Sequence, residues 1–171
     1  MELPERKSHK LERSILEFKE DLKELQSKHH AISEDILNLS SELLVNPLEE
    51  KLETVETLED LNYELRHDIL VNIEMTFESI GGFEIRLTDI DKYLPYIKDE
   101  QDLLNAMEIS VKNLVKTASV KDVTLTNQEK ENLRYLYNSY KKATNKTQNK
   151  LGEICEELEK MFQKVKKMEY I

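Results

Sequence analysis

Apolar residues recur near the start of the chain in alternating steps of four and three residues. They are Leu11, Ile15, Phe18, Leu22, Leu25, Ile32, Ile36, Leu39 and Leu43, with His29 at the one remaining position of the series. This heptad spacing is typical of a coiled-coil seam. We expect a helix over residues 5–45, with Pro4 at its start and Asn46-Pro47 at its end. At 1.5 Å per residue it would be about 60 Å long and would need a partner of comparable length.

The end of the chain repeats the pattern. Its seam consists of Leu133, Tyr137, Tyr140, Thr144, Thr147, Leu151, Ile154, Leu158, Met161, Val165 and Met168. The spacing predicts a helix over residues 127–169, about 65 Å long. Because the two seams match in length and period, we expect the first and last helices to lie side by side.

The middle of the chain is less regular. Residues 47–80 predict a second helix with a broader apolar face, which Gly81-Gly82 ends. Residues 83–94 fit either a short helix or an extended segment, and both interpretations stay open. The helical pattern resumes over residues 96–119.

These elements predict an all-α fold. We expect residues 1–171 to form a single domain, an elongated antiparallel bundle of about four helices with heptad seams in the first and last. Since the outer two helices are longer than the others, they would project as a two-helix stalk.

Composition supports this fold and excludes several classes of protein. With 35% charged residues, 6% aromatic residues and only 3 Gly, the chain has the composition of long helices. A net charge of −10 argues against direct binding of nucleic acid. Cys155 is the only cysteine, so no intrachain disulfide can form. No run of about 18 apolar residues is present to span a membrane, and we expect a cytoplasmic protein.

The acidic charge is concentrated in one segment. Residues 46–80 contain ten acidic residues against Lys51 and Arg66. The candidate partner-binding residues there are Glu49, Glu53, Glu56, Glu59 and Asp60. A basic protein partner is the functional interpretation, and a solvated face is the structural alternative.

Tyr135, Tyr137 and Tyr140 form the densest aromatic group and are a second candidate partner surface. Tyrosine suits interfaces because it combines a rigid apolar body with a polar tip. The alternative is a bundle core that is polar in its middle.

His29 occupies a seam position, where a buried polar residue can set helix register. A pH-sensitive seam is a second hypothesis for His29, since histidine titrates near neutrality.

Three further side chains raise the alternative of a metal- or small-ligand-binding bundle. Glu64 and His67 match the Glu-x-x-His pair of di-iron bundles, and His30 lies four residues before Glu34. A di-iron site needs a second such motif, which the sequence lacks, so we expect no metal and no cofactor.

The last helix suggests another alternative, a module that acts at a membrane surface. Its lysines, Lys160, Lys164, Lys166 and Lys167, alternate with apolar residues. Neighbouring glutamates dilute this charge, and lysines also suit a helix C-terminus, so membrane binding is not favoured.

No nucleotide-binding, hydrolase or metalloprotease motif is present in the chain. We therefore expect a non-enzymatic interaction module, an adaptor, scaffold or inhibitor that presents helical and acidic surfaces to a protein partner. A seam left unpaired within the chain would instead drive homodimerisation.

Overall fold

The computed structural model describes residues 3–45, 52–81, 92–118 and 127–168. These ranges are helical apart from a turn at Lys92 and Tyr93, and contain no strand. In chain order the elements are α1 (Leu3–Val45), α2 (Leu52–Glu64), the π-helical turn η2 (Leu65–Ile69), α3 (Leu70–Gly81), α4 (Leu94–Ala118) and α5 (Asn127–Met168).

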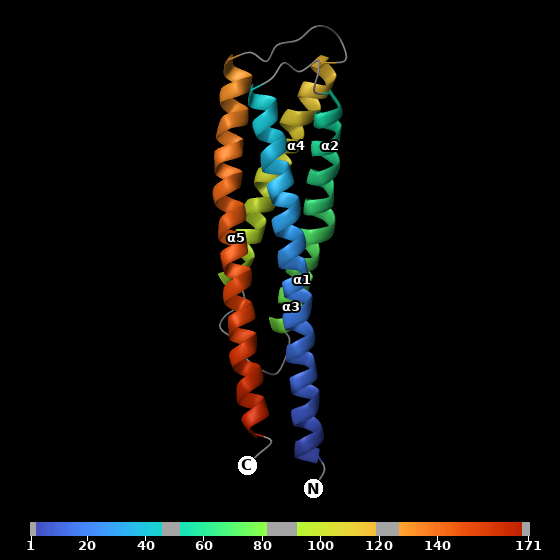
Figure 1. The fold of residues 1–171 in the computed structure, drawn as a ribbon, viewed down its shortest axis with the longest axis vertical. Helices are drawn as coiled ribbons and strands as arrows, with labels where there is room; N and C mark the ends of the chain where they lie inside the picture. Colours follow the sequence, from blue (N-terminus) through green and yellow to red (C-terminus); the bar gives the residue numbers. More distant parts are fainter. Residues whose placement is uncertain (1–2, 46–51, 82–91, 119–126, 169–171) are drawn as a thin grey trace.

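The elements form an elongated antiparallel bundle, as expected (Figure 1). α2, η2 and α3 continue into one another as a single rod, so the described part of the chain makes four rods that run alternately up and down. α1 packs against α5 and against the α2–α3 rod, and α4 packs against the same two neighbours. α1 and α5 extend beyond α3 and α4 at the end where both chain termini lie (Figure 1).

α1 buries one row of its seam more deeply than the other. The deeply buried row is Ile15, Leu22, His29, Ile36 and Leu43, each at most 2% exposed. The other row is Leu11, Phe18, Leu25, Ile32 and Leu39, which are partly buried against the core. Each fully buried large aliphatic side chain contributes about 1.5–3 kcal/mol. The core thus buries one row of α1 side chains completely and the other row only in part.

The α2–α3 rod contains one residue more than a regular pattern needs. Its deeply buried positions are Val55, Leu58, Asn62, Leu65, Leu70, Ile73, Phe77 and Ile80. These steps alternate three and four except between Leu65 and Leu70, where the step of five falls within η2. The wider π turn takes up the extra residue, Ile69, which also faces the core at 5% exposure.

The core of this rod differs in one residue from the face that the sequence suggests. Apolar spacing favours Leu61, which is only half buried, whereas Asn62 is 1% exposed. The Asn62 Nδ2 atom donates a hydrogen bond of 3.0 Å to the backbone oxygen of Leu104. This bond to α4 offsets the cost of burying the amide.

α4 begins at Leu94, two residues before the predicted start. Pro95 lies in the first turn, where its missing N–H costs no intrahelical hydrogen bond. Residues 83–91 fall outside the described part of the chain, so the choice between helix and extended segment there stays open.

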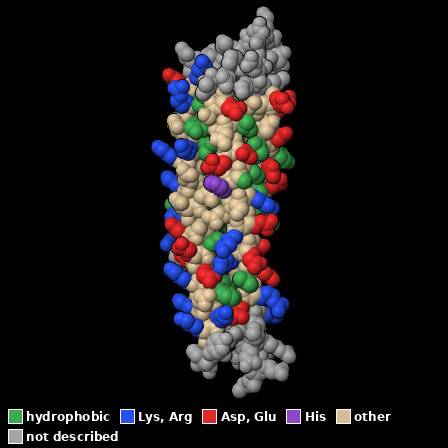
Figure 2. All heavy atoms as spheres, in the orientation of Figure 1, with side chains coloured by type: hydrophobic (Ala, Val, Ile, Leu, Met, Phe, Trp, Pro, Cys, Tyr) green, Lys and Arg blue, Asp and Glu red, His purple; other side chains and the backbone are tan. Residues whose placement is uncertain are grey.

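Charge separates onto opposite edges of the bundle. Residues 52–81 contain eight acidic residues and one arginine, whereas residues 127–168 contain ten basic residues and six glutamates. In Figure 2 acidic side chains gather along the edge over α2, and basic ones along the edge over α5.

Candidate protein-interaction surface

The acidic residues of α2 form a stripe on the outside of the bundle. Glu53, Glu56 and Asp60 are exposed and follow one another at steps of three and four, so they share a face of the helix. Glu59 is half buried beside them, and Glu49 lies outside the described residues. Arg66 is the one basic residue of this rod, and its guanidinium pairs with Glu108 on α4. The charge of Arg66 is therefore directed to α4 and not to the stripe.

Tyr63 continues the same stripe and did not stand out in the sequence. It is 58% exposed, and its ring lies 4.3 Å from that of His67 between centroids. The steps from Asp60 to Tyr63 and from Tyr63 to His67 are three and four, which places all three on the face that carries Glu53. This spacing is the feature of the sequence from which the place of Tyr63 on the acidic face could have been predicted. Tyr63 adds an exposed aromatic surface, which favours cations, to an acidic face.

The three tyrosines of α5 do not form one surface. Tyr135 is 68% exposed and Tyr137 is half buried. Tyr140 is fully buried and its hydroxyl donates a hydrogen bond of 3.1 Å to Ser33 Oγ on α1. Burial, reinforced by the nearby Glu100 carboxylate, raises the pKa of Tyr140 far above its ordinary value. Of the three, only Tyr135 is fully exposed.

His29 lies at the centre of a buried polar cluster that links α1, α4 and α5. Its Nε2 atom is 2.5 Å from Glu100 Oε2, and both side chains are fully buried. On the other side of the ring, Gln148 Nε2 lies 2.6 Å from His29 Nδ1 and also donates to the Gln26 backbone oxygen at 3.0 Å. Because Gln148 donates to Nδ1, the ring proton is assigned to Nε2, which donates to Glu100.

The cluster extends through hydroxyl groups. Thr144 Oγ1 donates to Ser33 Oγ at 2.9 Å, and Glu100 Oε1 is buried with no hydrogen-bond partner among the described residues. The cluster is deeply buried except at Gln148, which is half buried. Its other side chains are each at most 3% exposed: His29, Ser33, Glu100, Tyr140 and Thr144. These contacts join residues of three helices, and the register role of His29 stays a prediction. The pH-sensitive seam stays a hypothesis.

The candidate metal ligands are exposed and dispersed. Glu64 and His67 lie on the outside of the α2–α3 rod, and His30 lies on the outside of α1. Within the described ranges no group of three or more His, Cys, Asp or Glu side chains is placed to hold a metal ion.

The lysines at the end of α5 are exposed, while Met161 and Phe162 pack against the core. The Lys166 ammonium lies 5.9 Å from the centre of the Phe162 ring. No described helix is long and apolar enough to cross a membrane.

Cys155 lies in the bundle at 7% exposure, and burial raises the pKa of its thiol despite the nearby charges of Lys23 and Lys19. Only the thiolate reacts with iodoacetamide, and a raised pKa keeps the thiol protonated at alkaline pH. We expect alkylation at about pH 8 to be at least about tenfold slower in the folded protein than in urea. Mass spectrometry of the modified chain measures both rates. Equal rates would show that α5 does not pack here as described.

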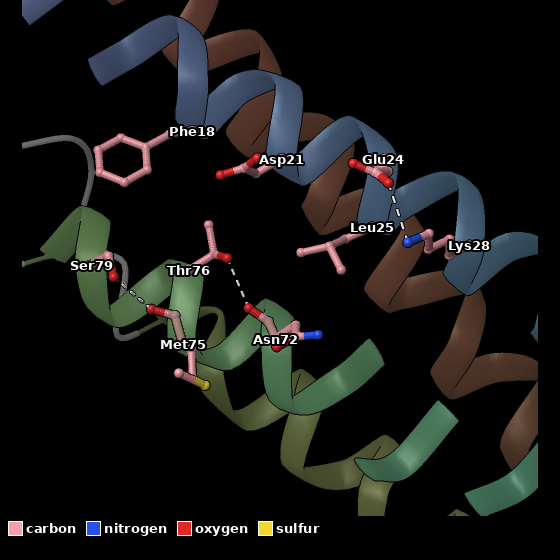
Figure 3. A pocket seen from close by; sticks show the side chains of 9 residues that line it. All are labelled: Phe18, Asp21, Glu24, Leu25, Lys28, Asn72, Met75, Thr76 and Ser79. Atoms are coloured by element: carbon pink, nitrogen blue, oxygen red, sulfur yellow. Dashed lines mark hydrogen bonds and ion pairs between the residues drawn. The ribbon is translucent and has the colours of Figure 1, made fainter. Parts of the chain in front are cut away.

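Two of the grooves between neighbouring helices of the described part of the chain are lined by residues of α1, α3, α4 and α5. The first, of about 370 Å³, lies between α1 and α3 (Figure 3). Its lining consists of Phe18, Asp21, Glu24, Leu25, Lys28, Asn72, Met75, Thr76 and Ser79. The second, of about 440 Å³, lies between α4 and α5. Lys142 and Lys146 oppose Asp99 and Asp102 in its lining, so its charges balance.

Comparisons with known proteins add no family to this description. No protein-family model matches the sequence, and no significant match is found among curated proteins or solved structures.

Proposed function

We propose that this protein is a non-enzymatic interaction module that binds a basic protein partner through the outer face of α2 and α3. The acidic stripe of α2 carries this proposal. Its carboxylates are exposed, Tyr63 lies among them, and the one arginine of the rod is paired with α4. An adaptor, a scaffold and an inhibitor would all use such a surface.

Physical considerations favour protein over other ligands. The stripe is convex, so it offers no enclosure for a small molecule, whereas a protein surface can meet many of its carboxylates at once. Complementary charge of this kind mainly raises the association rate and the specificity. Binding through it should weaken with salt, because exposed charges are screened.

The proposal is tested by charge reversal on α2. Replacing Glu53, Glu56 and Asp60 together with lysine is expected to weaken partner capture by about tenfold or more, since each exposed ion pair is worth about 0.2–1 kcal/mol and reversal adds repulsion. Helicity should not change, because all three side chains are exposed. The measurement is affinity capture from the native lysate with quantitative mass spectrometry.

A matched variant separates position from net charge. Glu34, Asp35 and Glu156 are also exposed but lie on α1 and α5, and their joint replacement with lysine changes the net charge equally. We expect this control to keep the partner. Loss of the same partner from both variants, or from neither, would refute docking on α2.

A further inference from the structure

A second charged stripe lies on α5. Residues 132–152 contain five basic residues and no acidic one. One of the five, Lys150, lies 3.3 Å from the carboxylate of Glu153. The other four are exposed and form the basic stripe: Arg134, Lys141, Lys142 and Lys146. None of these four side chains forms an ion pair with another residue of the described ranges, so their charges are directed to the surroundings.

The fold places the acidic stripe of α2 and the basic stripe of α5 at diagonal corners of the bundle. Both α5 and the α2–α3 rod pack on α1 and on α4, so the outer faces of α2 and α5 point in opposite directions. Both stripes lie in the half of the bundle away from the chain termini (Figure 1). Acidic and basic side chains accordingly gather on opposite edges (Figure 2). The two stripes of one molecule therefore cannot pair with each other.

The two stripes match in spacing as well as in charge. Glu53 and Asp60 are one heptad apart on α2. Arg134 and Lys141 are one heptad apart on α5. Seven residues of an α-helix span about 10.5 Å in both cases. When these two helices lie side by side, both acids can therefore meet both bases at the same time.

Each stripe also carries an exposed tyrosine. Tyr63 is 58% exposed and follows Asp60 by three residues, and Tyr135 is 68% exposed next to Arg134. Tyrosine supplies apolar contact area that ion pairs alone lack, and the face of its ring attracts lysine and arginine. Exposed tyrosines of this kind are enriched at the centres of protein interfaces.

We propose that the acidic stripe of one molecule binds the basic stripe of a second copy of this chain. The inference rests on the proposed function, because it uses the same acidic stripe and names its basic partner. Since the two stripes face opposite ways, each pair of copies still exposes one stripe of each sign. Such a head-to-tail contact builds open chains or rings of copies and not only dimers. The net charge of −10 opposes association, so binding is weak and depends strongly on salt.

Sedimentation velocity of the purified full chain tests the inference. At about 0.01 M salt the weight-average sedimentation coefficient is expected to rise with protein concentration. At about 1 M salt, where the Debye length falls from about 30 Å to about 3 Å, the chain should be monomeric. A monomer at both salt concentrations would overturn the inference, while the capture experiment above would still decide the proposed function. Association that persists at high salt would show that charge does not cause it.

Charge reversals locate the contact. Replacing the three acids of the acidic stripe with lysine, or Arg134, Lys141 and Lys142 with glutamate, is expected to lower the association constant at least about tenfold. The α2 reversal brings the net charge nearer to zero, which by itself favours association. Its loss of association would therefore come from the stripe and not from the net charge.

The combined variant, which carries both reversals, is the matched control. It has the original net charge, and its two stripes are complementary again with their signs exchanged. It is expected to self-associate at low salt as the original chain does. Circular dichroism checks that each variant is folded. A folded combined variant that stays monomeric, or an α5 reversal that leaves association unchanged, would refute pairing of the two stripes.

Discussion

Replacing His29 with leucine is expected to destabilise the bundle by about 3–5 kcal/mol, the usual cost of leaving a buried carboxylate without its partner. The Glu100 carboxylate would lose its 2.5 Å contact, and its other oxygen has no hydrogen-bond partner in the described part of the chain. Glu100 is fully buried, so water cannot take the place of His29. No other cation of the described residues pairs with Glu100. The loss is measured by urea unfolding followed by circular dichroism.

The companion variants identify the cause. Glu100→Leu alone should cost less, about 1–3 kcal/mol, because the imidazole is left with one unmet donor. The double variant, with leucine at both positions, should be within about 1–2 kcal/mol of the original protein in stability or exceed it, since apolar residues can often replace a buried polar pair without loss of stability. A double variant as unstable as His29→Leu would show that packing, and not pairing, is responsible.

Deleting Ile69 is expected to leave the bundle folded, whereas deleting Glu74 in the same rod should disrupt it. Without Ile69 the π turn can become α-helical, and Leu65, Leu70, Ile73, Phe77 and Ile80 then follow regular steps of four, three, four and three. We expect a loss of no more than about 3 kcal/mol, the burial of one isoleucine side chain. Deletion of Glu74 removes no buried side chain, but it rotates part of the rod by roughly 100° relative to the rest.

The expected cost of the Glu74 deletion is at least about 5 kcal/mol, because Phe77 and Ile80 can no longer face the core together with Ile73. Thermal and urea unfolding of the two variants provide the comparison. Cooperative unfolding of both proteins with equal midpoints would contradict the assigned role of η2.

The sequence predicted the helices well because their spacing is a local property. Steps of three and four place Ile15, Leu22 and Ile36 on one face of α1 whatever packs against it, and the structure buries all three. The π turn was missed, although a signal existed. Leu61, Leu65, Ile69, Ile73 and Phe77 are each four residues apart, and such a run drifts by about 40° per step around an α-helix. Leu65, Ile69, Ile73 and Phe77 are all deeply buried, and Leu61 is half buried.

The candidate surface was predicted in part for the same reason. Spacing alone indicates that Glu53, Glu56 and Asp60 share a face, and a charged face is seldom buried. Spacing does not indicate which tyrosine of α5 meets α1, because that depends on the pairing of distant segments. Tyr140 meets Ser33 only once the bundle has formed. The groove depends likewise on α3 lying beside α1, which no local pattern specifies.

The pairing of α1 with α5 also bears on how the protein folds. Its contacts join residues far apart in sequence, from 107 positions for Tyr140 and Ser33 to 140 for Lys19 and Glu159, whereas Asn62 and Leu104 are 42 apart. Closing the longer loops costs only about 1 kcal/mol more in chain entropy. Contacts of this range nevertheless raise the contact order and slow folding relative to a bundle of purely local hairpins. The longest interface therefore also joins the segments that are farthest apart in sequence. The buried polar groups at its centre form their hydrogen bonds in only one alignment of the two helices.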